Sequence, residues 1–227
     1  FTQIKLHDRT IQGIPIPVYD HYFTNGMNIG IPGNPAPSVG LEWKRMFHPV
    51  DTRIFSPAPL QQNSVYTTVM NWQSHAPINY QGRSYGQKDI EFEKFLTLPG
   101  LCDRAMEIAV AGKFVPHEKL RSNGWSVENG LEVTRSFDSF RQHIQESRGE
   151  FSVCKNVFVD MQTGWFSDKS AAFLASGRPV ILQDTGFSRH LPTGLGLFAV
   201  KDVEEARDAI DAIESSYEKH CRAAREL

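Results

Sequence analysis

Residues 167–170 combine the side chains and the backbone position best suited to binding an anion. Ser167, Asp168, Lys169 and Ser170 stand where an apolar helical pattern begins. The first amides of a helix lack intrahelical acceptors, and a helix start favours an anion by about 0.3–1 kcal/mol, or up to about 2 kcal/mol when it is partly buried. Lys169 and Lys155 could add charge-assisted hydrogen bonds worth about 1.5–3 kcal/mol. The pattern therefore predicts a cradle for a diphosphate; alternatively, Ser167 and Asp168 are ordinary helix caps and Lys169 is solvated.

The residues that lead into this segment are candidate contacts as well. Asn156 follows Lys155 just after an expected strand, and Gly164, Trp165 and Phe166 come directly before the helix start. Glycine has no Cβ, so it lets a backbone approach a ligand closely. We therefore include these residues in the predicted binding site.

Two more polar loops follow expected strands. Asn71 and Trp72 come after an apolar run, and they either contact a ligand or form a turn in which Trp72 packs on the core. Asp184 and Thr185 come before Gly186, which permits a sharp turn. Their side chains could bind sugar hydroxyls, or they could form an Asx-type turn.

These loops require a scaffold, which the sequence predicts from residue 61 onward. Short β-branched or apolar runs indicate strands at residues 65–70, 106–110, 131–134, 151–154, 180–182 and 197–200. Helices are expected from Asp89 and Pro116, and over residues 137–144, 167–175 and 203–217. This alternation predicts an α/β, Rossmann-like parallel sheet with helices on both faces, and a ligand beyond the carboxyl ends of its strands.

Residues 1–60 have a different composition, because they hold eight of the 13 prolines. Proline removes a backbone donor and fixes φ, so this stretch is expected to form loops and short edge strands. The chain opens at Phe1 without a methionine, in a run with Ile4 and Leu6 that favours a strand. We therefore expect an irregular remnant of an amino-terminal domain and a linker over residues 1–60, and a Rossmann-like domain over residues 61–227.

The bulk composition excludes several classes of function. With 24 basic and 26 acidic residues the net charge is -2, which lacks the basic footprint of a nucleic-acid-binding protein. Three widely spaced cysteines favour neither a disulfide framework nor a zinc site, and they fit a cytoplasmic location. The eight histidines form no helix-spaced metal pair, so no metal is expected. No apolar run reaches 18 residues, so no membrane span is expected either.

The run from Gly164 to Val180, continuing to Phe187, resembles the carboxy-terminal domain of GT-B fold glycosyltransferases. In those enzymes a helix ends in an Ala-Ser-Gly-x-Pro-Val turn, as over Ala175–Val180 here, and leads into a buried strand and a glycine-containing loop. The matching order extends from residue 61 over about three-quarters of the chain. Residues 147–153 also look like a group of bacterial GT-B-like proteins.

The resemblance implies that residues 61–227 form a nucleotide-sugar-binding Rossmann-like domain, and that a sugar is transferred from a nucleoside-diphosphate-sugar donor to an unknown acceptor. It implies no cofactor and no metal, with the diphosphate at residues 167–170 and the acceptor on a mostly missing amino-terminal domain. Many members hold the nucleotide ribose with a glutamate at the position of Ala172, and Asp168, one turn earlier, could take its place. A non-catalytic nucleotide-sugar-binding module and a sugar-nucleotide epimerase on the same fold stay open as alternatives.

Overall fold

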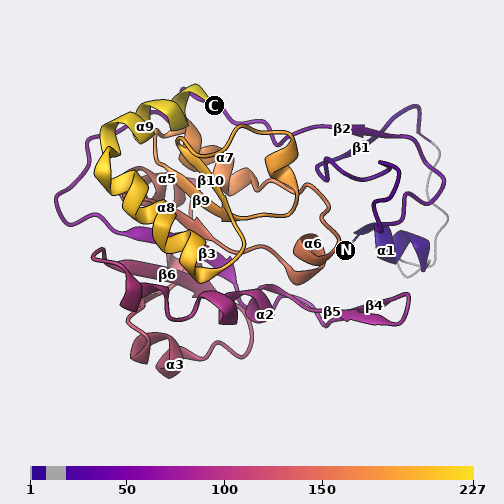
Figure 1. The fold of residues 1–227 in the computed structure, drawn as a ribbon, viewed down its shortest axis with the longest axis horizontal. Helices are drawn as coiled ribbons and strands as arrows, with labels where there is room; N and C mark the ends of the chain where they lie inside the picture. The colour runs from indigo at the N-terminus through magenta and orange to yellow at the C-terminus, as the bar shows by residue number, and fades with distance from the viewer. Residues whose placement is uncertain (1, 9–18) are drawn as a thin grey trace.

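A six-stranded, all-parallel sheet forms the centre of the protein. The computed structural model describes residues 2–8 and 19–227 (Figure 1). The strands are β3 (Tyr66–Asn71), β6 (Met106–Ala111), β7 (Ser126–Asn129), β8 (Gly149–Ser152), β9 (Val180–Gln183) and β10 (Leu197–Val200), in the order β10-β9-β8-β3-β6-β7. When these strands are numbered one to six along the chain, the order is 3-2-1-4-5-6, which is that of doubly wound Rossmann sheets. The predicted α/β fold with a parallel sheet is confirmed. The order in which successive strands are added to the sheet reverses between β3 and β8, which is the topological switch point.

Helices cover both faces of this sheet, as Figure 1 shows. One apolar cluster joins the sheet to α2 (Lys88–Phe92), α3 (His117–Ser122), α8 (Val203–Ser215) and the short turns Glu93–Phe95 and Leu98–Leu101. A second cluster joins the opposite face to α5 (Phe137–Glu146), α7 (Asp168–Ala175), α9 (Tyr217–Glu226) and the turn Phe187–Arg189. Buried Ile181 belongs to the first cluster and its neighbours Val180 and Leu182 to the second, as strand alternation requires.

Local capping explains where several helices begin. Ser136 and Ser139 form a reciprocal capping box at the start of α5, and Asp202 accepts a hydrogen bond from the Glu205 amide at the start of α8. Ser167 stands at the predicted N-cap of α7, although its hydroxyl makes no capping bond. The expected final helix over residues 203–217 is instead two helices, because the chain leaves helical geometry at Ser216.

Two predicted strands are wrong. Residues 131–134 belong to the short helix α4 (Gly130–Val133) and its end, because the Asn129 side chain accepts a hydrogen bond from the Leu131 amide and caps a helix there. The strand at this place is β7, which ends at Asn129. Residues 2–7 form helix α1 (Thr2–His7), whose Ile4 is buried, instead of a strand; Phe1 lies outside the described residues.

Three more elements, the two strands of a hairpin and one helix, were absent from the sequence prediction. The antiparallel hairpin of β4 (Ile78–Tyr80) and β5 (Arg83–Tyr85) extends from the body of the protein toward α1 (Figure 1). Helix α6 (Asn156–Asp160) lies between β8 and α7. Asp89, the predicted cap, lies inside α2, whose N-cap is Gln87.

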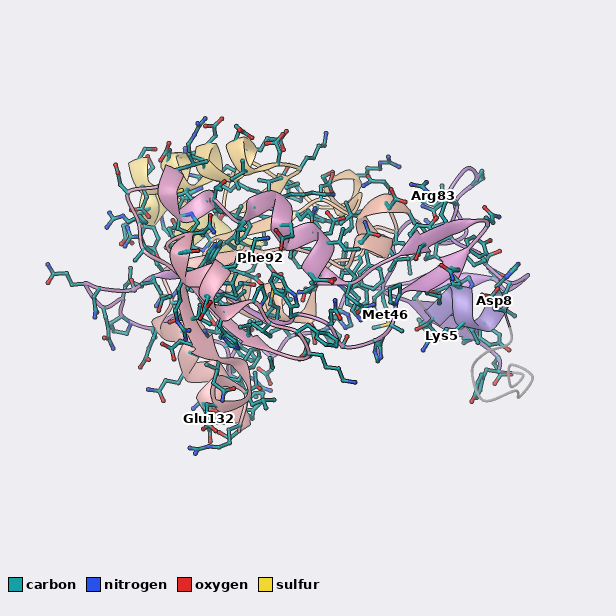
Figure 2. The ribbon with its side chains drawn as sticks, turned by 90° about the horizontal axis from the view of Figure 1, so that it is seen from below. Lys5, Asp8, Met46, Arg83, Phe92 and Glu132 are labelled. Carbon is teal, nitrogen blue, oxygen red and sulfur yellow. The ribbon has the colours of Figure 1, made fainter. Side chains whose placement is uncertain are left out.

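The amino-terminal segment packs on these three elements. Its short strands β1 (Tyr22–Thr24) and β2 (Trp43–Arg45) pair in parallel, and a third apolar cluster joins residues 29–43 and α1 to the hairpin and α6. Figure 2 places Lys5 of α1 and Asp8, which follows this helix, at the same end of the molecule as Arg83 of the hairpin, whereas Phe92 lies within its body. The proline-rich residues 9–18 lie outside the described part of the chain.

No helix within residues 2–8 and 19–227 is long and apolar enough to cross a membrane.

Candidate functional site

A cavity of about 380 Å³ lies at the switch point of the strand order, between β3 and β8. Its walls include Asn71 at the carboxyl end of β3, Ala111 at the carboxyl end of β6 and Lys155 in the loop that follows β8. Ligands of doubly wound sheets bind in the crevice beyond the carboxyl ends of the strands at this switch point. The cavity therefore stands at the position that the fold itself provides for a ligand.

The start of α7 forms one wall of this cavity, through Ser167, Asp168 and Lys169. The Lys169 amide already donates to Asp168 Oδ1 over 2.8 Å. The amides of Asp168 and Ser170 have no acceptor among the residues that the structure describes. Ser170 is fully buried and does not line the cavity, so of these two amides the one at Asp168 is available to an anion.

Three lysines surround the cavity: Lys88 at the start of α2, Lys155 and Lys169. Burial is the largest cause that lowers the pKa of each, and the Lys88 charge lowers the pKa of the other two further. Asp168 opposes this effect at Lys88, whose pKa it raises. A bound anion stabilises positive charges that repel one another, because it brings an opposite charge close to them.

Lys169 forms an ion pair beneath the cavity. Its Nζ bonds to the carboxylate of Glu150 and donates to Ser152 Oγ over 3.0 Å. Glu150 is fully buried on β8, and its second oxygen, Oε2, has no partner within the described residues. The alternative of a solvated Lys169 is therefore wrong, and this lysine neutralises a buried carboxylate beneath the cavity. Lys88 makes no hydrogen bond or ion pair to any described residue.

A buried carboxylate holds the loop that carries Lys155. Glu91 of α2 is fully buried and accepts hydrogen bonds from Asn156 Nδ2, over 2.7 Å, and from Gln183 Nε2. Gln183 in turn accepts a hydrogen bond from the Cys154 amide over 3.1 Å. The residues on both sides of Lys155 are thus fixed through one group, which preorganises the lysine at the cavity wall.

Five of the fourteen sequence-predicted site residues line this cavity, namely Asn71, Lys155, Ser167, Asp168 and Lys169. Trp72 is 4% exposed and packs against Phe92 in the core, in agreement with the alternative interpretation. Asn156 uses its side chain in the Glu91 network. Phe166 and Ser170 are buried, and Ser170 Oγ has no partner among the described residues.

The structure places the remaining predicted residues away from this cavity. Asp184 accepts hydrogen bonds from the amide of Gly186 and the hydroxyl of Ser188, which is the Asx-type turn given as the alternative. Thr185 is fully buried and donates to the Trp165 carbonyl over 2.6 Å. Gly164, at φ +73°, lets residues 27 and 28 of the amino-terminal segment approach, so it serves close packing of the chain on itself.

Several cavity residues were missed by the sequence prediction, namely Val69, Met70, Ser74, Lys88, Ala111, Gly130, Leu131, Thr134 and Phe140. Lys88 was identifiable only as a lysine beside an expected helix start. Leu131 was assigned to a strand, but it is an exposed apolar side chain at the cavity rim. With Phe140 it gives the cavity an apolar side across from its lysines.

The three cysteines are free thiols, and burial raises the pKa of the Cys154 thiol to about 12. Within the described part of the chain, no group of three or more His, Cys, Asp or Glu side chains is placed to hold a metal ion. Comparisons of the chain with protein-family models and with curated proteins found no match.

Proposed function

We propose that this chain is the nucleotide-sugar-binding domain of a GT-B type glycosyltransferase, and that the cavity at the switch point holds the diphosphate of the donor. The observation that carries the proposal is the placement of Lys88, Lys155 and the start of α7 around one cavity beyond the carboxyl ends of β3 and β8. A diphosphate provides a charge opposite to that of Lys88, which has no ion pair among the described residues, together with oxygens for the Asp168 amide.

The remainder of the cavity suits the nucleoside. Leu131 and Phe140 offer an apolar surface for a base, and Asp168 offers an exposed carboxylate that can accept hydrogen bonds from ribose hydroxyls. Ala172, which stands at the family's ribose-binding position, is 4% exposed within the core cluster under α7. Asp168 is therefore the residue of α7 that we assign to the ribose.

Sugar transfer breaks the bond between the anomeric carbon and the terminal phosphate oxygen, and the electron pair stays on that oxygen. A new bond forms from the acceptor oxygen to the anomeric carbon, and the acceptor proton passes to a general base, a role that we assign to no residue of this chain. Lys88, Lys155 and the Asp168 amide at the start of α7 would stabilise the negative charge that develops on the leaving diphosphate. Such preorganised groups act more strongly as the charge grows, so they favour the transition state over the bound donor.

A non-catalytic nucleotide-sugar-binding module is the second candidate. It is favoured by the absence of a carboxylate at residue 172, since this position gives the ribose no contact. The two candidates share the diphosphate site and differ only in turnover.

Calorimetric titration of the chain with UDP, GDP and dTDP tests the shared site. We expect at least one nucleotide to bind, and a ligand at about 100 times its Kd to stabilise the fold by about 2.7 kcal/mol. Absence of binding for all three would refute the nucleotide site. Donor hydrolysis or transfer with the bound nucleotide then separates the enzyme, which releases nucleoside diphosphate, from the module, which does not.

A further inference from the structure

A second cavity, of about 220 Å³, lies between the amino-terminal segment and the loop that leads into α7. Its hydrogen-bonding side chains are hydroxyls and amides, and no charged side chain lines it among the described residues. These neutral groups belong to Thr2, Gln3, Thr24, Asn25 and Thr163. Thr163 is 6% exposed, and its Oγ1 has no hydrogen-bond partner within the described part of the chain. A buried hydroxyl without a partner is costly, so it indicates a ligand group that completes it.

Aromatic rings form much of the remaining wall, from Phe23, Trp43, Phe158 and Trp165. Phe158 and Trp165 stack with their ring centroids 5.0 Å apart, which gives the cavity a rigid flat surface. The negative face of an aromatic ring attracts groups with positive edges, such as the C–H bonds of a pyranose. Rings combined with neutral hydrogen-bonding groups suit an uncharged, hydroxylated ring, because an anion would find no cation there and a lipid chain would leave the polar groups unpaired.

The second cavity adjoins the proposed diphosphate site. Trp165 lines the second cavity and Ser167 lines the first, and two residues of chain span at most about 7 Å. Between them Phe166 is buried in the core, whereas its two neighbours are partly exposed. Phe158 of α6 lines the second cavity, and Lys155, the residue before this helix, lines the first.

We propose that this second cavity binds a neutral hexopyranoside, as the acceptor subsite of the enzyme. The role of this sugar as the acceptor rests on the proposed function, whereas the presence of a sugar site does not depend on nucleotide binding. Thr163 Oγ1 bonds to a sugar hydroxyl, and the Phe158–Trp165 pair packs against the apolar face of the ring.

The test titrates the chain with methyl glycosides of glucose, galactose, mannose, rhamnose and N-acetylglucosamine, with and without UDP, GDP or dTDP. Tryptophan fluorescence reports binding, because Trp43 and Trp165 line the cavity while Trp72 and Trp125 lie in the core. Sorbitol, an uncharged polyol without a ring, is the control ligand. We expect saturable binding of at least one glycoside and none of sorbitol.

Thr163→Val keeps the shape of the side chain and removes its hydroxyl, and we expect it to weaken glycoside binding about 3- to 10-fold. Thr193→Val, at an exposed threonine outside both cavities, is the matched control and leaves binding unchanged. Binding of none of the five glycosides, or equal affinity in Thr163→Val and the parent, overturns the sugar site. Nucleotide binding without glycoside binding would overturn this inference alone, whereas glycoside binding without nucleotide binding would uphold the sugar site and refute the proposed function.

Discussion

Removal of the Lys88 charge separates the binding role of this lysine from any role in folding. Lys88→Met keeps most of the side-chain stem but removes the ammonium, which makes no hydrogen bond or ion pair to the described residues. A charge-assisted hydrogen bond contributes about 1.5–3 kcal/mol, so nucleoside diphosphate affinity should fall about 10- to 100-fold. Stability should not fall, because the substitution also removes a half-buried charge that repels Lys155 and Lys169.

Calorimetry measures the affinity of this variant, and thermal unfolding without ligand measures its stability. Lys219→Met, at an exposed lysine of α9, is the control for the loss of one positive charge and should leave affinity unchanged. Equal affinity in Lys88→Met and the parent would refute the assignment of Lys88 to the diphosphate. A melting temperature that falls together with affinity would instead show that Lys88 stabilises the fold.

Three further predictions follow from the same contacts. Burial lowers the pKa of Lys88 and of Lys155, so as the pH rises both side chains lose their charge before it reaches the ordinary lysine pKa of 10.5. The affinity for a nucleoside diphosphate should therefore fall as pH rises, and constant affinity between about pH 7 and about pH 10 would contradict this. Lys169→Met leaves Glu150 buried without its cation and should cost about 3–5 kcal/mol in urea unfolding, whereas the double variant Lys169→Met with Glu150→Met should lose less; a larger loss in the double variant would refute the pairing. Gly164→Ala should lower the free energy of unfolding by about 1–3 kcal/mol, because φ is +73° and the new Cβ would stand 2.9 Å from the Asn28 amide nitrogen. Gly194→Ala is the control, because φ is +96° there but no atom lies within 4 Å of the new Cβ, and it should cost less. Equal losses in the two variants would exclude the steric contribution.

The sequence predicted the elements whose signals are local. The apolar run at residues 180–182 is a buried strand, and the helix over residues 167–175 begins and ends as expected, since Gly177 provides a left-handed residue after it. The order of the strands, which places the site between β3 and β8, follows from their alternation with helices together with packing that only the structure provides.

Side-chain surroundings could not be predicted, because they depend on tertiary packing. The sequence leaves Trp72 open to two interpretations, and the structure shows that it packs against Phe92. The same holds for Asp184, whose two carboxylate oxygens accept hydrogen bonds within its own turn. Lys169 looked like a surface cation, and its partner Glu150 lies on a different element. Lys88 reaches the cavity only because α2 packs beside α6, a contact that no local pattern encodes.

A crystal structure of the chain with a bound nucleoside diphosphate tests the central claim most directly. We expect phosphate oxygens within about 3.2 Å, a hydrogen-bond distance, of Nζ of Lys88 and Lys155 and of the Asp168 amide, in the cavity beyond β3 and β8. Density for the nucleotide elsewhere on the molecule, with Lys88 and Lys155 out of reach of its phosphates, would contradict it.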